Sequence, residues 1–112
     1  MNPSDLYSEA LAILTRTRNS MLLPAWQAAL DQTTPGTRLD ASQELIQVQQ
    51  GIVALSNASL SDIADAMDAQ KQDLIDSIAD LKDTIEDLTQ VQDVLQSVSN
   101  LIAVVGKIVP LL

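Results

Sequence analysis

The sequence predicts an all-α protein, and three observations support this fold class. Apolar residues recur every seven positions through the C-terminal half, from Leu60 to Val109, which is typical of a helix that packs against another helix. The chain has only three Gly and four Pro, mostly before residue 52, so it offers little turn chemistry for a sheet. It has no Phe, one Trp and one Tyr, so its core must be built mainly from aliphatic residues.

The N-terminal segment, residues 1–38, is expected to hold two short helices and a loop. Ser4 is a plausible cap, and apolar residues at helical spacing follow it, which predicts a helix over about 5–19. A proline stands where a first helical residue is favoured and predicts a second helix over 24–30. A Pro-Gly pair among threonines indicates a loop over 33–37.

The remaining residues, 39–112, are expected to form an antiparallel helical hairpin. Asp40 is placed to cap a helix over about 40–56, whose apolar residues follow at spacings of three and four: Leu45, Val48, Ile52 and Leu55. If one straight helix continued through 56–59, this stripe and the heptad pattern beyond it would face about 160° apart. A turn there predicts a long second helix over about 59–109, although a larger bundle would use both faces of one continuous helix.

The long helix is expected to carry the surface for self-association into a helical bundle or coiled coil. Its heptad seam consists of Leu60, Met67, Leu74, Ile78, Leu81, Ile85, Leu88, Leu95, Ile102 and Val109. Polar residues interrupt the seam at Lys71, Gln92 and Ser99, where they either set the register of the interface or lie at its solvated edge. An arm of about 75 Å exceeds the roughly 25 Å that the helix over 40–56 can cover. The segment over 5–30 is expected to shield part of the rest, and a second copy the remainder.

The C-terminal end is the most apolar part of the chain. Its candidate contacts with a partner or a membrane are Leu101, Ile102, Val104, Val105, Ile108, Val109, Leu111 and Leu112. Twelve helical residues reach about 18 Å, whereas the hydrocarbon core of a bilayer is about 30 Å thick. A membrane span is therefore disfavoured. Burial in an oligomer core is the expectation, and a segment that inserts into a membrane is the alternative.

The charge of −9 is unevenly distributed along the chain. Residues 62–93 contain ten acidic residues against Lys71 and Lys82, which repels polyanions and argues against nucleic acid as a partner. Five aspartates in this region follow helical spacing and are expected to form a solvated face, since carboxylates strung along a straight helix do not converge on one ion: Asp73, Asp76, Asp80, Asp83 and Asp87.

Catalytic chemistry is poorly provided for. The chain has no His and no Cys, which removes the common nucleophilic triads and the usual zinc sites, and it has no Gly-rich phosphate loop. We therefore expect a non-enzymatic helical interaction or assembly module without cofactor, metal or small-molecule substrate. Its expected partners are its own copies and another helical protein; a membrane-active protein of the pore-forming kind is the alternative. The first residues lack signal-peptide features, so a cytoplasmic location is the default expectation.

Overall fold

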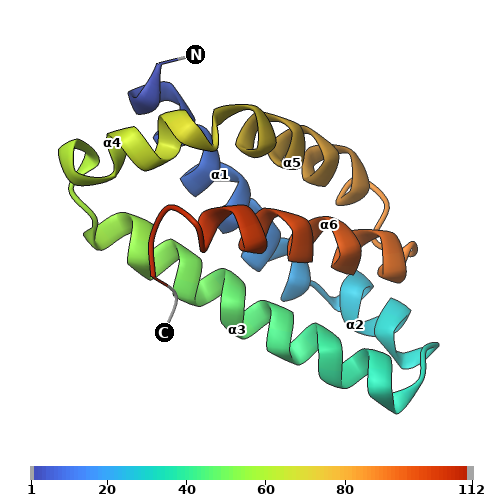
Figure 1. Cartoon of the computed structure of the whole chain (residues 1–112). Coiled ribbons are helices and arrows are strands. Elements are labelled where there is room, and N and C mark those ends of the chain that lie inside the picture. Colours follow the sequence, from blue (N-terminus) through green and yellow to red (C-terminus); the bar gives the residue numbers. More distant parts are fainter. Residues whose placement is uncertain (1, 111–112) are drawn as a thin grey trace.

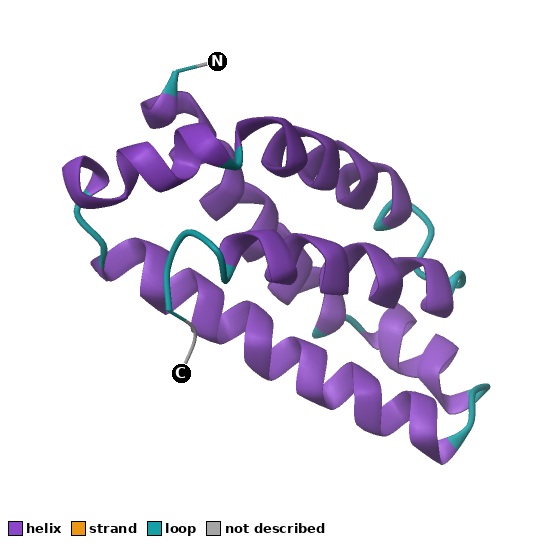
Figure 2. Cartoon of the chain, viewed as in Figure 1, coloured by secondary structure: helices purple, strands orange, loops and turns teal. Residues whose placement is uncertain are grey.

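The computed structural model describes residues 2–110 and is helical almost throughout this range, with no strand in it (Figures 1 and 2). The helices are α1 (Pro3–Met21), α2 (Pro24–Asp31), α3 (Pro35–Asn57), α4 (Leu60–Ala69), α5 (Lys71–Thr84) and α6 (Val91–Val105). The predicted all-α class is confirmed.

The longer helices α1, α3, α6 and α5 form a bundle in which each contacts the next around a ring. In Figure 1, α6 runs between α5 and α3, while α1 passes behind them. The short helix α2 follows α1, and the short helix α4 leads into α5. The described chain measures 43 × 26 × 18 Å, and its buried aliphatic residues form one core. The predicted boundary after residue 38 lies inside α3, and residues from both sides of it contribute to that core.

The N-terminal helices begin where prolines favour a first helical turn. Asn2 caps α1, its side chain accepting a hydrogen bond from the Asp5 amide at 2.8 Å, and Pro24 opens α2 as predicted. The loop expected over 33–37 is shorter than predicted. Thr34 caps α3 by accepting a hydrogen bond from the Thr37 amide at 3.2 Å, so the Pro-Gly pair forms the first turn of α3 rather than a loop.

The break predicted at 56–59 is present, but the long helix over 59–109 is not. The chain bends at Gln70 between α4 and α5, and it reverses direction over 85–90 so that α5 and α6 run antiparallel (Figure 1). In the reversal, one carboxyl oxygen of Asp87 accepts hydrogen bonds from the Thr89 amide at 3.1 Å and the Thr89 hydroxyl at 2.6 Å. These bonds lower the pKa of Asp87, and one of them gives the Thr89 amide a hydrogen-bond partner in a turn without Gly or Pro.

The expected hairpin of a 40–56 helix with a 59–109 helix is therefore wrong. The helix that was expected over 40–56 is α3, which begins five residues earlier and packs on α1 and α6. Gly51 lies at this junction: a Cβ there would meet the Leu14 side chain at 3.5 Å and the Ile102 side chain at 3.7 Å. The antiparallel neighbours in the second half of the chain are instead α5 and α6, which pack on each other because both present apolar faces to the same core.

Candidate functional site

The residues predicted to form a self-association seam lie inside the single chain. Eight of the ten are buried and the other two, Leu60 and Leu88, are half-buried against the same core. The buried ones are Met67, Leu74, Ile78, Leu81, Ile85, Leu95, Ile102 and Val109. The uncovered arm of about 75 Å does not exist, because the chain folds back on itself and covers its own seam. Association through these side chains would require the bundle to open, so self-association stays a prediction that needs another surface.

The polar residues that interrupt the seam lie at the edge of the bundle. Gln92 and Ser99 are exposed on α6, and Lys71 is half-buried at the start of α5. The side-chain amide of Gln92 donates to the Thr37 hydroxyl at 3.2 Å, which links α6 to the first turn of α3. These residues therefore lie at the edge of the chain's own bundle, and a register-setting role in an interface between copies stays a prediction.

The apolar C-terminal segment is also covered by the chain. Within the described range, the side chains proposed to contact a partner or a membrane are all buried: Leu101, Ile102, Val104, Val105, Ile108 and Val109. After α6 the chain turns back across α3 (Figure 1). Leu111 and Leu112 lie outside the described residues. Between residues 2 and 110, no helix combines the length and the apolar character that crossing a membrane requires.

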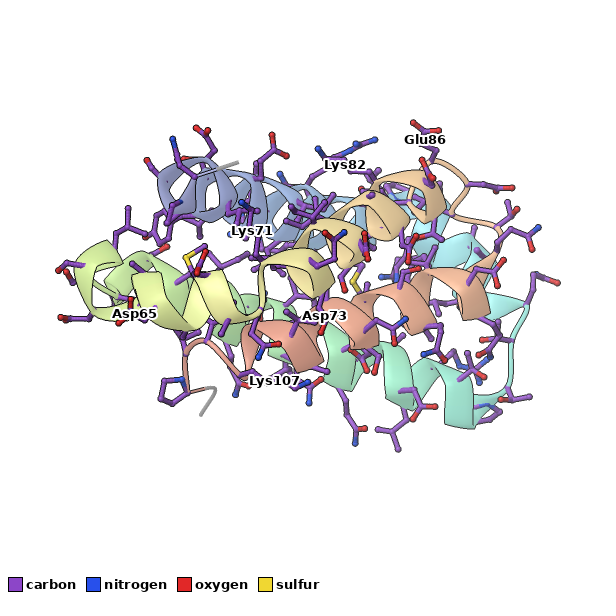
Figure 3. All side chains as sticks on the ribbon, turned by 45° about the horizontal axis from the view of Figure 1, so that its top comes forward. Asp65, Lys71, Asp73, Lys82, Glu86 and Lys107 are labelled. Carbon is purple, nitrogen blue, oxygen red and sulfur yellow. The ribbon has the colours of Figure 1, made fainter. Side chains whose placement is uncertain are left out.

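The acidic side of the molecule is built from α4, α5 and the turn after α5. The five aspartates of the predicted solvated face are all exposed. Lys82 pairs with Glu9 of α1 at 2.8 Å, and Figure 3 shows Lys82 and Glu86 at the upper edge of the molecule. Both partners of the pair are exposed, so solvent screens their attraction and the pair contributes little to stability. Over residues 2–110, no three acidic, His or Cys side chains converge in a way that suits a metal ion.

A polar groove of about 200 Å³ lies between α3 and α6. Burial, followed by repulsion from the Asp40 carboxylate, raises the pKa of Glu44 in this groove. The Glu44 Oε2 atom is buried and has no hydrogen-bond partner among the described residues. The groove also contains Gln43, Gln92, Gln96 and Ser99, so it offers amide and hydroxyl groups but no second buried charge.

The outer face of α3 carries the most distinctive surface feature of the described chain. Leu39, Ile46 and Val53 are 60%, 53% and 57% exposed, although each is a large aliphatic residue. They are seven residues apart, and at 100° per residue they lie within about 20° of one line along the helix. We call these three residues the α3 row. The row points away from the core, because the buried residues of α3, such as Val48 and Leu55, lie on the opposite side of the helix.

The surroundings of the α3 row are uncharged toward its C-terminal end. Its flanks carry Ser42, Gln43, Gln49, Gln50 and Asn57, and α3 has no charged residue after Glu44. A groove of about 440 Å³ runs beside the second half of the row and is lined by Ile46, Gln49, Gln50, Val53, Ala54, Asn57 and Pro110. Pro110 reaches this groove because the segment after α6 crosses α3 (Figure 1). The row and the groove together form the candidate interaction surface.

This surface was not predicted from the sequence. The stripe predicted on α3, which includes Val48 and Leu55, is the one that the core buries. The second stripe had a visible signal, because counting backward by sevens from Leu60 reaches Val53, Ile46 and Leu39. The other helices of the described chain cover only the inner face of α3, and the outer apolar face stays exposed.

Comparison of the chain with protein-family models, with curated proteins and with solved structures finds no match. Its function must therefore be inferred from the chemistry of its own surface.

Proposed function

We propose that the protein is a non-enzymatic helical interaction module that self-associates through the outer face of α3. The observation that supports this proposal is the α3 row, three aliphatic side chains that are each more than half exposed and that repeat every seven residues. Isolated exposed apolar residues are common on soluble proteins. A heptad-spaced row instead supplies one of the two apolar positions per heptad through which helices pack together in coiled coils.

The distribution of charge favours association through α3 over association through the acidic side. The chain carries a net charge of −9, and most of its acidic residues lie in α4, in α5 and in the segment that joins α5 to α6. Two copies that met through those elements would bring carboxylates together, which costs free energy. Two copies that met through the α3 row would bring together aliphatic side chains and neutral amides. Another helical protein with a matching apolar row is a further partner of the same kind.

The size of the surface indicates a weak interaction. A helix of 23 residues is about 34 Å long and presents a strip about 10 Å wide. The strip of about 340 Å² is below the roughly 800 Å² that each partner buries in a standard stable complex. We therefore expect a dimer that forms reversibly and depends on protein concentration.

Analytical ultracentrifugation of the wild type, Ile46→Lys and Gln47→Lys tests the proposal. Gln47 is exposed and lies about 100° around α3 from Ile46, so its substitution adds the same charge to the same helix outside the row. Over about 10 μM to about 1 mM, we expect the wild type and Gln47→Lys to dimerise and Ile46→Lys to remain monomeric. Circular dichroism checks that all three proteins have the same helix content. A wild type that is monomeric throughout, or two variants that behave alike, would contradict the proposal.

Membrane activity is a second candidate, and one observation favours it. The large apolar residues of the segment over 101–109 are buried in the core. A segment that inserts into a membrane only after the bundle opens must be shielded from water in this way beforehand. In this second hypothesis the protein would co-sediment with vesicles of neutral phosphatidylcholine. The α3 hypothesis instead predicts that the protein stays in the supernatant.

A further inference from the structure

The two ends of the α3 row have complementary shapes. At the N-terminal end, Leu39 projects into solvent and is the most exposed large apolar side chain of the described residues. Near the C-terminal end, Val53 and Pro110 line the groove of about 440 Å³. Leu39 is seven residues before Ile46, and Val53 is seven residues after it. A two-fold symmetric pair requires a projection and a recess at equal distances from its axis.

We propose that two copies of this chain pair through α3 in antiparallel orientation about a two-fold axis at Ile46, so that Leu39 of each copy enters the groove beside Val53 of the other. This proposal rests on the self-association proposed above and specifies the arrangement of the two copies. It makes Ile46 of one copy contact Ile46 of the other at the centre of the interface.

The groove has the residues that a coiled-coil partner side chain requires. In knobs-into-holes packing, one side chain enters a hole formed by four residues of the facing helix. The antiparallel pairing brings Leu39 of one copy opposite Val53 of the other, and Val53 forms a hole with Gln50, Ala54 and Asn57, which all line the groove. Pro110 also lines this groove, so the segment that crosses α3 after α6 becomes part of the interface.

The helix dipoles of α3 favour the antiparallel orientation. Arg38, Asp40 and Glu44 all lie in the N-terminal half of α3, and residues 45–57 carry no charge. Asp40 and Glu44 line the groove beside α6, about 120° and 160° around α3 from Ile46, so neither carboxylate faces the second copy. The antiparallel pair places this charged half beside the uncharged half of the other helix, and it also sets the two helix dipoles in opposite directions.

The flanking glutamines can be satisfied in the same arrangement. A glutamine side chain both donates and accepts hydrogen bonds, so two of them can pair without a charged group. About a two-fold axis at Ile46, Gln43 of one copy lies near Gln50 of the other on one side of the row. The uncharged amides beside the row therefore suit a second copy of this chain better than a strongly charged partner.

Disulfide trapping tests the pairing, because the chain contains no cysteine of its own. Leu39→Cys and Val53→Cys are prepared separately, oxidised alone and oxidised as an equimolar mixture, and the products are identified by intact mass. The mixed disulfide should exceed each symmetric disulfide by about tenfold, because a disulfide requires Cα atoms within about 7 Å. In the proposed pair, the two copies of residue 39 are about 21 Å apart along the helix axis, as are the two copies of residue 53.

A second pair of variants keeps the α3 row intact. Gln43→Cys mixed with Gln50→Cys should also yield the mixed disulfide as the main product, which guards against loss of association through removal of Leu39. Symmetric disulfides that form as readily as the mixed ones, in both sets, would show a parallel or non-specific contact and overturn the proposed pairing. If Ile46→Lys abolishes dimerisation but neither mixture cross-links, the pairing fails and the proposed function stands. A wild type that never dimerises makes both fail.

Discussion

The outer faces of α3 and α5 differ sharply, although both helices bury one side in the same core and turn the other to solvent. The outer face of α5 carries the exposed carboxylates of Asp73, Asp76, Asp80 and Asp83. The outer face of α3 carries the aliphatic α3 row between neutral polar residues. Folding of one chain constrains only the inner faces, because only these exchange water for apolar neighbours. A difference between the outer faces is therefore a difference in what each face can bind.

The largest expected effect separates inner faces from outer faces. Leu81, on the inner face of α5, is fully buried, so Leu81→Asp should destabilise the fold by about 4 kcal/mol or more through an unpaired buried charge. Urea unfolding monitored by circular dichroism measures this loss. The neighbouring exposed residue provides a control, since Asp80→Asn should change the free energy of unfolding by less than about 0.5 kcal/mol. A Leu81→Asp protein of wild-type stability would refute the assignment of the core.

The second prediction uses substitutions that make the outer face of α3 acidic, like that of α5. Ile46→Asp combined with Val53→Asp should weaken self-association at least about tenfold, which corresponds to about 1.4 kcal/mol. The free energy of unfolding should change little, because both side chains are mainly exposed in the single chain. Sedimentation equilibrium gives the first quantity and urea unfolding the second. Loss of stability in parallel with loss of association would mean that the α3 row supports the fold itself.

A smaller effect concerns the edge of α3 that faces α6. Because burial and Asp40 raise the pKa of Glu44, the folded chain keeps this carboxyl protonated to a higher pH than the unfolded chain does. The contribution of Glu44 to the free energy of unfolding is therefore fully present below the pKa that the carboxyl has in the unfolded chain. It is lost as the pH rises through the higher pKa of the folded chain. A glutamine stays neutral, so Glu44→Gln should raise the Tm at about pH 7 and leave it nearly unchanged at about pH 4. If the wild type and Glu44→Gln had the same Tm at about pH 7 as well as at about pH 4, the raised pKa of Glu44 would be contradicted.

The smallest effect is expected on the outer face of α5. Asp76→Asn combined with Asp83→Asn should leave the Tm nearly unchanged, because both carboxylates are solvated and neither is part of an ion pair in the described structure. Differential scanning calorimetry with and without added divalent cations measures the Tm. A large drop, or a cation effect that the double variant lacks, would show that these carboxylates hold a metal ion.

The periodicity of the sequence was sufficient to predict which side chains of the C-terminal half avoid water. The residues of the heptad seam are buried or half-buried, the aspartates between them are exposed, and the break near residue 57 is present. It was not sufficient to predict the turn over 85–90. This turn has no Gly or Pro, and the two hydrogen bonds that Thr89 donates to the Asp87 carboxylate in it cannot be told from ordinary surface contacts when only the sequence is known. The α3 row was not predicted, because the stripe with Val48 and Leu55 was sufficient to explain a buried face of α3 and the sequence alone does not show how many faces of a helix its own chain covers.

The sequence by itself therefore determined the fold class, the helix starts at Pro24 and near residue 60, and the identity of most buried residues, since these depend on local backbone chemistry and on the period of one helix. The tertiary structure decided which apolar face meets which. Hydrophobic burial has no direction, so a heptad seam is equally satisfied by a second copy or by a helix of its own chain. The reversal after α5 brings α6 onto α5 and onto the inner side of α3. That arrangement covers the seam and leaves the α3 row exposed.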